Sequence, residues 1–252
     1  MVTPGFRPVR RRYARVVHAV LIVTAALFGA VTGALTPRAV HRLSVPSGEP
    51  WRSTGSDGEP LPTGPRGWMG IRPGPRPVFP ALVGAGCAVL LAAACGPAPE
   101  TVLWVFMVPG TMVLAAVDIA VLRLPDVLTL PLAALAVLGT GVAALLPGAQ
   151  GSWPRAVAAA AVLAGVFFVL ALISPAGMGL GDVKLAPGLG AALGWYGWDV
   201  LLTGVFAGFL LAACYALFLV AARGAGRRTE FCMGPFLLLG ALVGVVIGGL
   251  VV

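Results

Sequence analysis

Long apolar stretches separated by short polar ones dominate the pattern of this chain. A membrane-spanning helix needs about 20 mostly apolar residues. Seven uncharged stretches approach or exceed that length, and the stretch at 185–198 has only 14 residues. The seven are residues 16–37, 77–99, 101–117, 127–154, 156–181, 200–222 and 231–252. We therefore predict an all-α, polytopic transmembrane helix bundle of about eight segments, one of them short.

Composition supports this class of protein. Hydrophobic residues make up 59% of the 252 residues, and charged residues only 10%, against about a quarter in a soluble domain. Disorder is excluded too, because it requires low hydrophobicity and many charges. The net charge of +8 would suggest nucleic acid on a soluble surface. Here the arginines lie between apolar stretches and indicate membrane topology, so we expect the lipid bilayer and no nucleic acid as a partner.

Three regions follow from the pattern. Residues 1–36 form an arginine-rich arm and a retained first helix, residues 37–77 a polar loop, and residues 78–252 the main membrane domain. The loop contains nine Pro and seven Gly among its 41 residues. Such a composition cannot bury a core, so a solvated loop is expected.

Orientation is predicted from the arginine and lysine residues between the stretches. With the N-terminus outside, eleven positive residues lie in the inner segments and six in the outer ones. The N-terminal arginines oppose this choice, but they are outnumbered. In either orientation, Asp118 and Asp182 close odd-numbered stretches and reach the same face, which we expect to be the cytoplasmic one.

Those two acids are the candidate catalytic residues. Carboxylates beside a membrane span are costly and usually functional. Two that lie close together cannot both ionise freely, so one keeps its proton. The charged carboxylate can then take a proton from water while the protonated one polarises a peptide carbonyl. An ion pair between Asp118 and Arg123 is the structural alternative for the first acid.

The second acid lies in a glycine-rich turn followed by the only lysine of the chain, Lys184. Gly177, Gly179 and Gly181 leave room for a substrate backbone near Asp182, although small residues also serve helix packing in membranes. Asp126 follows a proline and is expected to cap or support the next helix. No metal site is expected, because the cysteines at positions 87, 95, 214 and 232 lack paired spacing.

Several motifs resemble the prepilin peptidases, or type IV leader peptidases, a family of GxGD membrane aspartyl proteases. The most specific is GMGLGDVKLAPGLGAALGW at 177–195, and VDIAVLRLPDVLTLP at 117–131 is similar to the first active-site segment. MGPFLLLGALVG at 233–244 contains a Gly-Pro-Phe motif formed by Gly234, Pro235 and Phe236, and LFGAVTGALTPRAVHRL at 27–43 resembles the family's first helix.

The resemblance implies a peptidase that removes basic leader peptides from prepilin or pseudopilin precursors at the cytoplasmic face, without a cofactor. It makes Asp118 and Asp182 the catalytic pair, with Gly179 and Gly181 as the glycines of GxGD. The residues themselves leave open a proton- or ion-coupled transporter or channel using the same acids. An inactive relative is less favoured, because both aspartates are present. A presenilin-like protease is less favoured too, because that family has a tyrosine before its first aspartate, where this chain has Val117.

The chain departs from the family pattern at three places, and the first two bear on the second activity associated with the family, N-methylation of the new pilin N-terminus. Longer members carry two CxxC pairs in the first loop, whereas residues 37–77 contain no cysteine. The stretch that opens the second helix, FPALVG at 79–84, lacks the acid expected there. Cys232 replaces a proline before the Gly-Pro-Phe motif. We therefore expect leader removal without methyl transfer.

Overall fold

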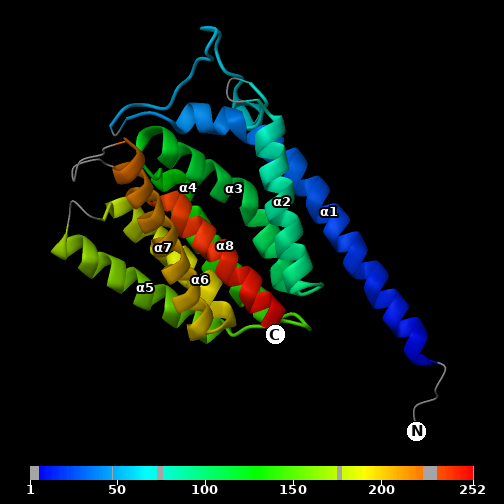
Figure 1. The fold of residues 1–252 in the computed structure, drawn as a ribbon. Coiled ribbons are helices and arrows are strands. Elements are labelled where there is room, and N and C mark those ends of the chain that lie inside the picture. Colours follow the sequence, from blue (N-terminus) through cyan, green and yellow to red (C-terminus); the bar gives the residue numbers. More distant parts are fainter. Residues whose placement is uncertain (1–5, 47, 73–75, 175–177, 224–231, 252) are drawn as a thin grey trace.

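The computed structural model describes residues 6–46, 48–72, 76–174, 178–223 and 232–251. In these ranges the chain forms eight α-helices and one short 3₁₀ helix, packed as a bundle (Figure 1). The α-helices are α1 (Phe6–Leu43), α2 (Val78–Cys95), α3 (Pro99–Val121), α4 (Asp126–Ala144), α5 (Trp153–Ile173), α6 (Leu180–Tyr196), α7 (Trp198–Arg223) and α8 (Gly234–Val251). All except the 17-residue α6 are long and apolar enough to cross a membrane. The predicted helical bundle with one short segment is confirmed.

Helix ends differ from the expected boundaries where the connecting residues are themselves apolar. The stretch 127–154 contains α4 except its first residue, a turn in which Gly148 has a φ of 86°, and the start of α5. The stretch 156–181 contains the rest of α5 and the first residues of α6. Asp182 therefore lies in the first turn of α6 and does not close the preceding helix. Hydropathy alone cannot separate an apolar turn from an apolar helix.

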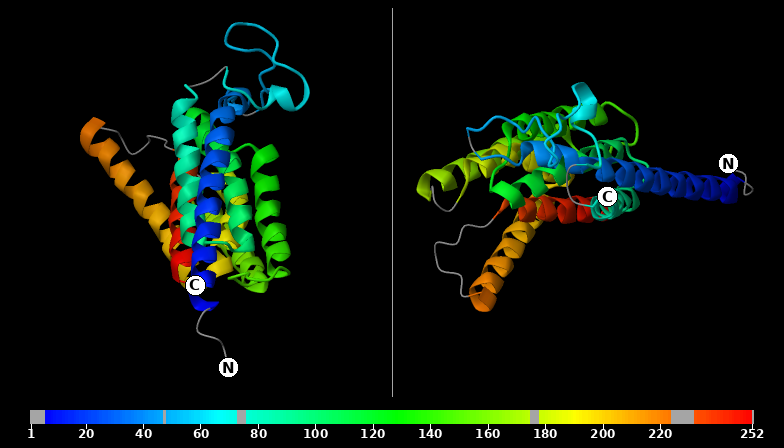
Figure 2. Two further views of the ribbon diagram at one scale, coloured as in Figure 1. Left: turned by 90° about the vertical axis from the view of Figure 1, so that its right-hand side faces the viewer. Right: turned by 90° about the horizontal axis from the view of Figure 1, so that it is seen from above.

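Helix α1 bends near its C-terminal end (Figure 1). Pro37 lies inside the helix, and proline removes one backbone hydrogen bond and clashes with the preceding turn. Beyond the bend, Leu43 packs against Val113 and Val117 of α3. The last turns of α1 thus cover the end of α3 that carries Asp118, while its first turns extend beyond the bundle (Figure 2).

Glycines bring α1 and α2 into backbone contact. A Cβ atom on Gly29 would meet the carbonyl group of Gly84, and one on Gly33 would meet the carbonyl group of Pro80. In lipid, helix association depends on such close packing of small residues. No side chain fits at Gly29 or Gly84 without moving one helix from the other.

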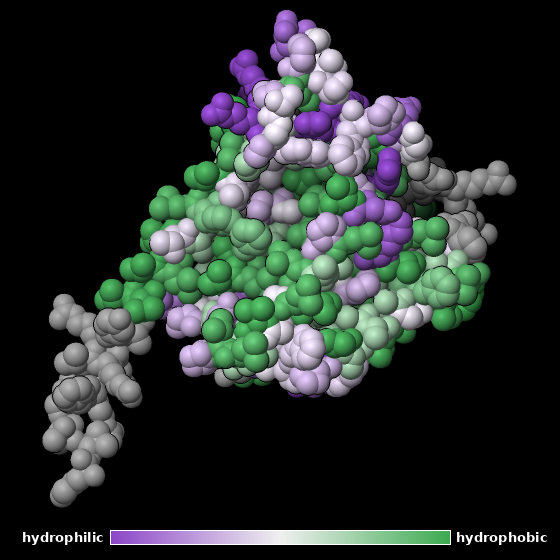
Figure 3. All heavy atoms as spheres, turned by 180° about the vertical axis from the view of Figure 1, so that it is seen from behind, coloured by the Kyte–Doolittle hydropathy of each residue, from purple (hydrophilic) through white to green (hydrophobic). Residues whose placement is uncertain are grey.

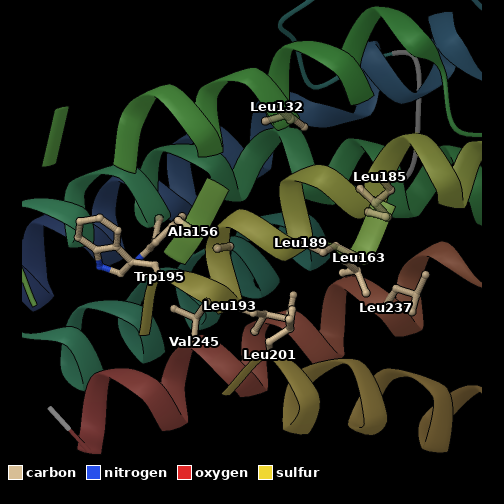
Figure 4. Packing of buried hydrophobic residues seen from close by; sticks show 14 of the residues in the cluster. Leu132, Ala156, Leu163, Leu185, Leu189, Leu193, Trp195, Leu201, Leu237 and Val245 are labelled. Carbon is tan, nitrogen blue, oxygen red and sulfur yellow. The ribbon is translucent and has the colours of Figure 1, made fainter. Parts of the chain in front are cut away.

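The core of the bundle surrounds α6. Its side chains Leu185, Leu189 and Leu193 point toward residues of the neighbouring helices, among them Leu132 of α4 and Leu237 of α8 (Figure 4). Gly190 lies directly against the backbone of α5 at Ala159 and Ala160. Helix α6 is therefore enclosed by protein, which suits its length of 17 residues, at the lower limit for a bilayer span.

The loop between α1 and α2 is more closely held than its composition predicts. Arg38 donates from Nε to the carbonyl of Arg72 at 2.6 Å and from one terminal nitrogen to the carbonyls of residues 66 and 69. The Arg42 guanidinium lies 4.4 Å from the ring centroid of Trp68, and Trp68 packs on the cluster that contains Val117. Most of residues 48–65 are exposed, but Arg38 and Arg42 fasten residues 66–72, the part of the loop that precedes α2, to α1.

The surface has a polar end and apolar flanks. Hydrophilic residues gather over the end that carries this loop, and hydrophobic residues cover most of the side of the bundle (Figure 3). Large side chains such as Phe168, Leu202 and Phe206 are more than half exposed. A bilayer covers such a surface, and with seven suitable helices the chain is a multi-pass membrane protein.

Candidate active site

Asp118 lies in the last turn of α3, and only 6% of its surface is exposed. Its Oδ2 accepts a hydrogen bond from the backbone N–H of Gly234 at 3.0 Å. Gly234 is the first residue of α8, so the positive end of that helix dipole faces the carboxylate. Arg123 donates instead to the carbonyls of Val45 and Pro46. The structure therefore does not pair Asp118 with Arg123, which was the structural alternative for this acid.

Asp182 lies in the first turn of α6 and is 8% exposed. Its backbone N–H donates to the carbonyl of Gly179 at 3.0 Å, where the chain enters the helix. The carboxyl groups of Asp118 and Asp182 are close enough to interact electrostatically. The fold thus brings together two acids that are 64 residues apart in the sequence.

The side chain of Leu124 lies between the backbone of Gly181, next to Asp182, and the backbone of Gly234, which binds Asp118. A Cβ atom on Gly181 would lie 3.1 Å from the Cβ of Leu124, and one on Gly234 would lie 3.3 Å from its Cδ2. Leu124 is 6% exposed and belongs to the short connection between α3 and α4. Leu122 in the same connection has a φ of 51°, a left-handed conformation that costs a non-glycine residue energy. Sequence reasoning missed Leu124 because its hydropathy does not distinguish it from many other leucines.

The turn glycines have different surroundings. At Gly179 there is room for a Cβ atom, which would lie in ordinary van der Waals contact with Asp182 Oδ2 at 3.5 Å. At Gly181 there is less room, because Leu124 lies against the position that a Cβ atom would occupy. Gly177, the third glycine of the predicted motif, lies outside the described residues.

Lys184 and Asp126 form an ion pair at the edge of the site. Lys184 Nζ donates to Asp126 Oδ1 and Oδ2 at 2.8 and 2.7 Å. The pair links the first turn of α6 to the first turn of α4. Asp126 does not cap its own helix, so of the two roles expected for it only a supporting one matches these contacts. Both side chains are exposed, and such pairs contribute little to stability.

Pro235 and Cys232 complete the region around α8. Pro235 is buried in the first turn of α8, a position that favours proline. Cys232 is a partly buried thiol. Burial first, and then the charge of Asp118, raise the pKa of Cys232. The residue that departed from the family pattern therefore lies near the first candidate aspartate, which its sequence position alone did not reveal.

No group of three or more His, Cys, Asp or Glu side chains that could hold a metal ion occurs among the described residues. The site thus consists of two buried carboxyl groups, a backbone N–H donor and glycines that leave the backbone uncovered. This set of groups can bind a water molecule and exchange protons with it.

A family model for the type IV leader peptidase family matches residues 105–249, more than half of the chain. The chain belongs to this family. It is therefore a peptidase of the type IV leader class and a multi-pass membrane protein. The matched region contains both buried aspartates and the N-terminus of α8 that binds one of them. Comparison with curated proteins and with solved structures found no match.

Proposed function

We propose that this protein is an aspartyl endopeptidase that removes the leader peptide from type IV prepilin or pseudopilin precursors at the cytoplasmic membrane face. The observation that carries the proposal is the pair of buried, interacting carboxyl groups of Asp118 and Asp182. A membrane protein accepts the cost of burying such groups chiefly where they have a function.

In the proposed reaction, a water molecule between the two carboxyl groups attacks the scissile peptide carbonyl. One carboxylate takes a proton from this water, and the other, protonated, carboxyl group donates a hydrogen bond to the carbonyl oxygen. The tetrahedral intermediate collapses when the carboxyl group that took the proton from water passes a proton to the leaving amine and the C–N bond breaks. The pair then returns to its starting protonation state, without a covalent intermediate.

The glycines and the N-terminus of α8 prepare the site for this step. Gly179 and Gly181 leave the entry to α6 without side chains, so an extended peptide can approach Asp182. The N–H of Gly234 holds Asp118 Oδ2 in a fixed position. Catalytic groups held in position before substrate binds avoid reorganisation during the reaction.

The transporter alternative requires polar groups through the depth of the membrane. Glu100, another buried acid, lies in the first turn of α3, at the opposite end of the helix from Asp118. Its Oε1 accepts hydrogen bonds from Trp195 Nε1 and from the backbone N–H of Gln150. These contacts favour a structural role for Glu100 in joining α3 to α6.

Asp118→Asn and Asp182→Asn test the proposal. Each should lower cleavage of a co-expressed prepilin from the same genome by roughly 100-fold or more, since acid–base catalysis of this kind contributes about 10²–10⁴-fold. Membrane insertion should persist, because a neutral side chain is less costly to bury. Asp199→Asn, at the exposed start of α7, is the matched control. A gel shift for leader removal measures the result, and cleavage by either active-site variant at the control's rate would refute the pair.

A further inference from the structure

An apolar groove of about 520 Å³ runs along α3 and opens between α2 and α8. The residues that line it on α2 recur mainly four positions apart, and those on α8 recur three or four positions apart, so each helix contributes one face. The walls include Phe79 and Val83 of α2 and Pro235 and Leu239 of α8. The α3 residues at its back extend from Trp104 to Ile119, about 22 Å at the rise of an α-helix. The groove therefore covers most of the roughly 30 Å hydrocarbon thickness of a bilayer.

One end of the groove lies at the candidate active site. Ile119 follows Asp118 in the sequence, Pro235 follows Gly234, and Leu185 lies one turn after Asp182, and all three line the groove. Thr36 and Pro37 line the same end from the bend of α1. The bent part of α1 thus borders the point where the groove reaches the two aspartates.

The other end is closed by contact between α2 and α8. A Cβ atom on Gly249 would lie 3.0 Å from the Cα of Cys95, so the two helices touch there. Toward the aspartates they diverge, and α3 is visible between them (Figure 1). Phe79 is 72% and Leu239 47% exposed. The side of the groove is therefore open toward the lipid and its far end is closed.

We propose that this groove binds the apolar transmembrane helix of the precursor, which enters from the lipid between α2 and α8. The inference rests on the proposed function and adds where the substrate is held. A polypeptide in hydrocarbon must be helical, because its backbone groups have no water to bond. A helix lying in the groove would present apolar residues at helical spacing to the similarly spaced residues of α2 and α8.

The closed and open ends determine how such a helix lies. Because α2 and α8 meet at Cys95 and Gly249, an occupant that has entered from the lipid can extend along the bundle only toward Asp118 and Asp182. The peptide that emerges there is delivered to the aspartates in the extended form that cleavage needs. A lipid acyl chain would fill the same apolar space but would gain nothing from ending beside two carboxyl groups. Continuity with the active site therefore favours the precursor helix over lipid.

Photo-cross-linking tests occupancy without requiring cleavage. Benzoylphenylalanine replaces Phe79 in the Asp118→Asn variant, and a prepilin precursor from the same genome is co-reconstituted in phosphatidylethanolamine–phosphatidylglycerol vesicles. We expect a precursor adduct whose cross-linked residue lies in the precursor's apolar helix. Leu82, on α2 but outside the groove and 67% exposed, is the matched control position. Adducts with lipid only, or equal precursor adducts at both positions, would overturn the inference.

Obstruction of the groove gives a second test. Val83→Trp and Leu239→Trp place large rings in the opening, whereas Leu82→Trp and Val243→Trp add the same ring on the same helices outside it. The first two should lower kcat/KM for the precursor by about tenfold or more, as steric mismatch in an apolar pocket does, and the controls by less than about twofold. Equal effects in both pairs would refute the groove. Failure of the wild-type protein to cleave the precursor would refute the proposed function instead, while the cross-link would still report on the groove.

Discussion

Gly234 is a single residue on which the geometry of Asp118 depends. Its N–H donates to Oδ2, and a Cβ on Gly234 would lie 2.8 Å from that same oxygen, closer than real contacts allow. Gly234→Ala therefore has to displace the carboxylate or the start of α8. A hydrogen bond to a charged group contributes about 1.5–3 kcal/mol, so we expect leader cleavage to fall about tenfold or more.

The control for this substitution is Gly165→Ala in α5, where a Cβ meets nothing within 4 Å. Both variants should reach the membrane at wild-type levels and elute from size-exclusion chromatography as the wild type does. Only Gly234→Ala should lose cleavage in the gel-shift assay. Equal cleavage by the two variants would mean that the N–H of Gly234 does not position Asp118.

At the scale of residues, the sequence identifies the acids of the candidate site better than it identifies the residues that pack around them. Asp118 and Asp182 stand out because charge is rare in this chain. Leu124 and Cys232 do not, because the packing that places them near the aspartates brings together residues from separate helices. The proline before Asp126 marks the start of a helix, but the partner of Asp126, Lys184, lies 58 residues away, beyond what local capping rules can indicate.

At the scale of elements, the contact between α1 and α2 bears on methyl transfer. The stretch that opens α2 lacks a carboxylate, and Gly84 lies against the backbone of Gly29, so this position cannot hold one. The preceding loop is fastened by Arg38 and Arg42 through backbone carbonyls and Trp68, and it contains no cysteine. We therefore expect this protein to cleave precursors without methylating the new N-terminus.

Mass spectrometry of the processed precursor, made in a host without another such enzyme, measures this. The mature N-terminus should have its unmodified mass. Gly84→Glu should not introduce methylation, and it should lower the thermal stability of the protein by forcing α1 and α2 apart. An N-terminal mass higher by one methyl group, absent when the gene is deleted, would contradict the expectation.

Helix number follows from hydropathy because each span must bury its backbone polar groups and cover itself with apolar side chains. Pro37, where the first helix was expected to give way to the loop, bends α1 without ending it, and the helix continues to Leu43. The ends of α4, α5 and α6 do not follow, since the intervening turns are apolar as well. The contacts that hold residues 66–72 to α1 also escape prediction, because they depend on the long Arg38 side chain reaching carbonyls about 30 residues away.

At the scale of the whole molecule, the same polar end carries the first loop, Arg123 and the paired Lys184. Arg155 lies at the opposite end and donates to the carbonyls of residues 194–196 at the C-terminus of α6. A cation that binds the last carbonyls of a helix serves that helix end. Arg155 therefore stabilises the C-terminus of α6 at this end of the bundle.

We accordingly expect the polar end, with Asp118 and Asp182, to face the cytoplasm, because positive residues concentrate in cytoplasmic segments. A reporter that is active only in the cytoplasm should be active when fused at Gly58 in the first loop or at Gly226, which lies outside the described residues. It should be inactive at Gly151, before α5. A reporter active only outside the cytoplasm, fused at the same three positions, should give the opposite pattern. Cytoplasmic activity at Gly151 would invert the topology and place both aspartates on the outer face, where a basic leader retained in the cytoplasm could not reach them.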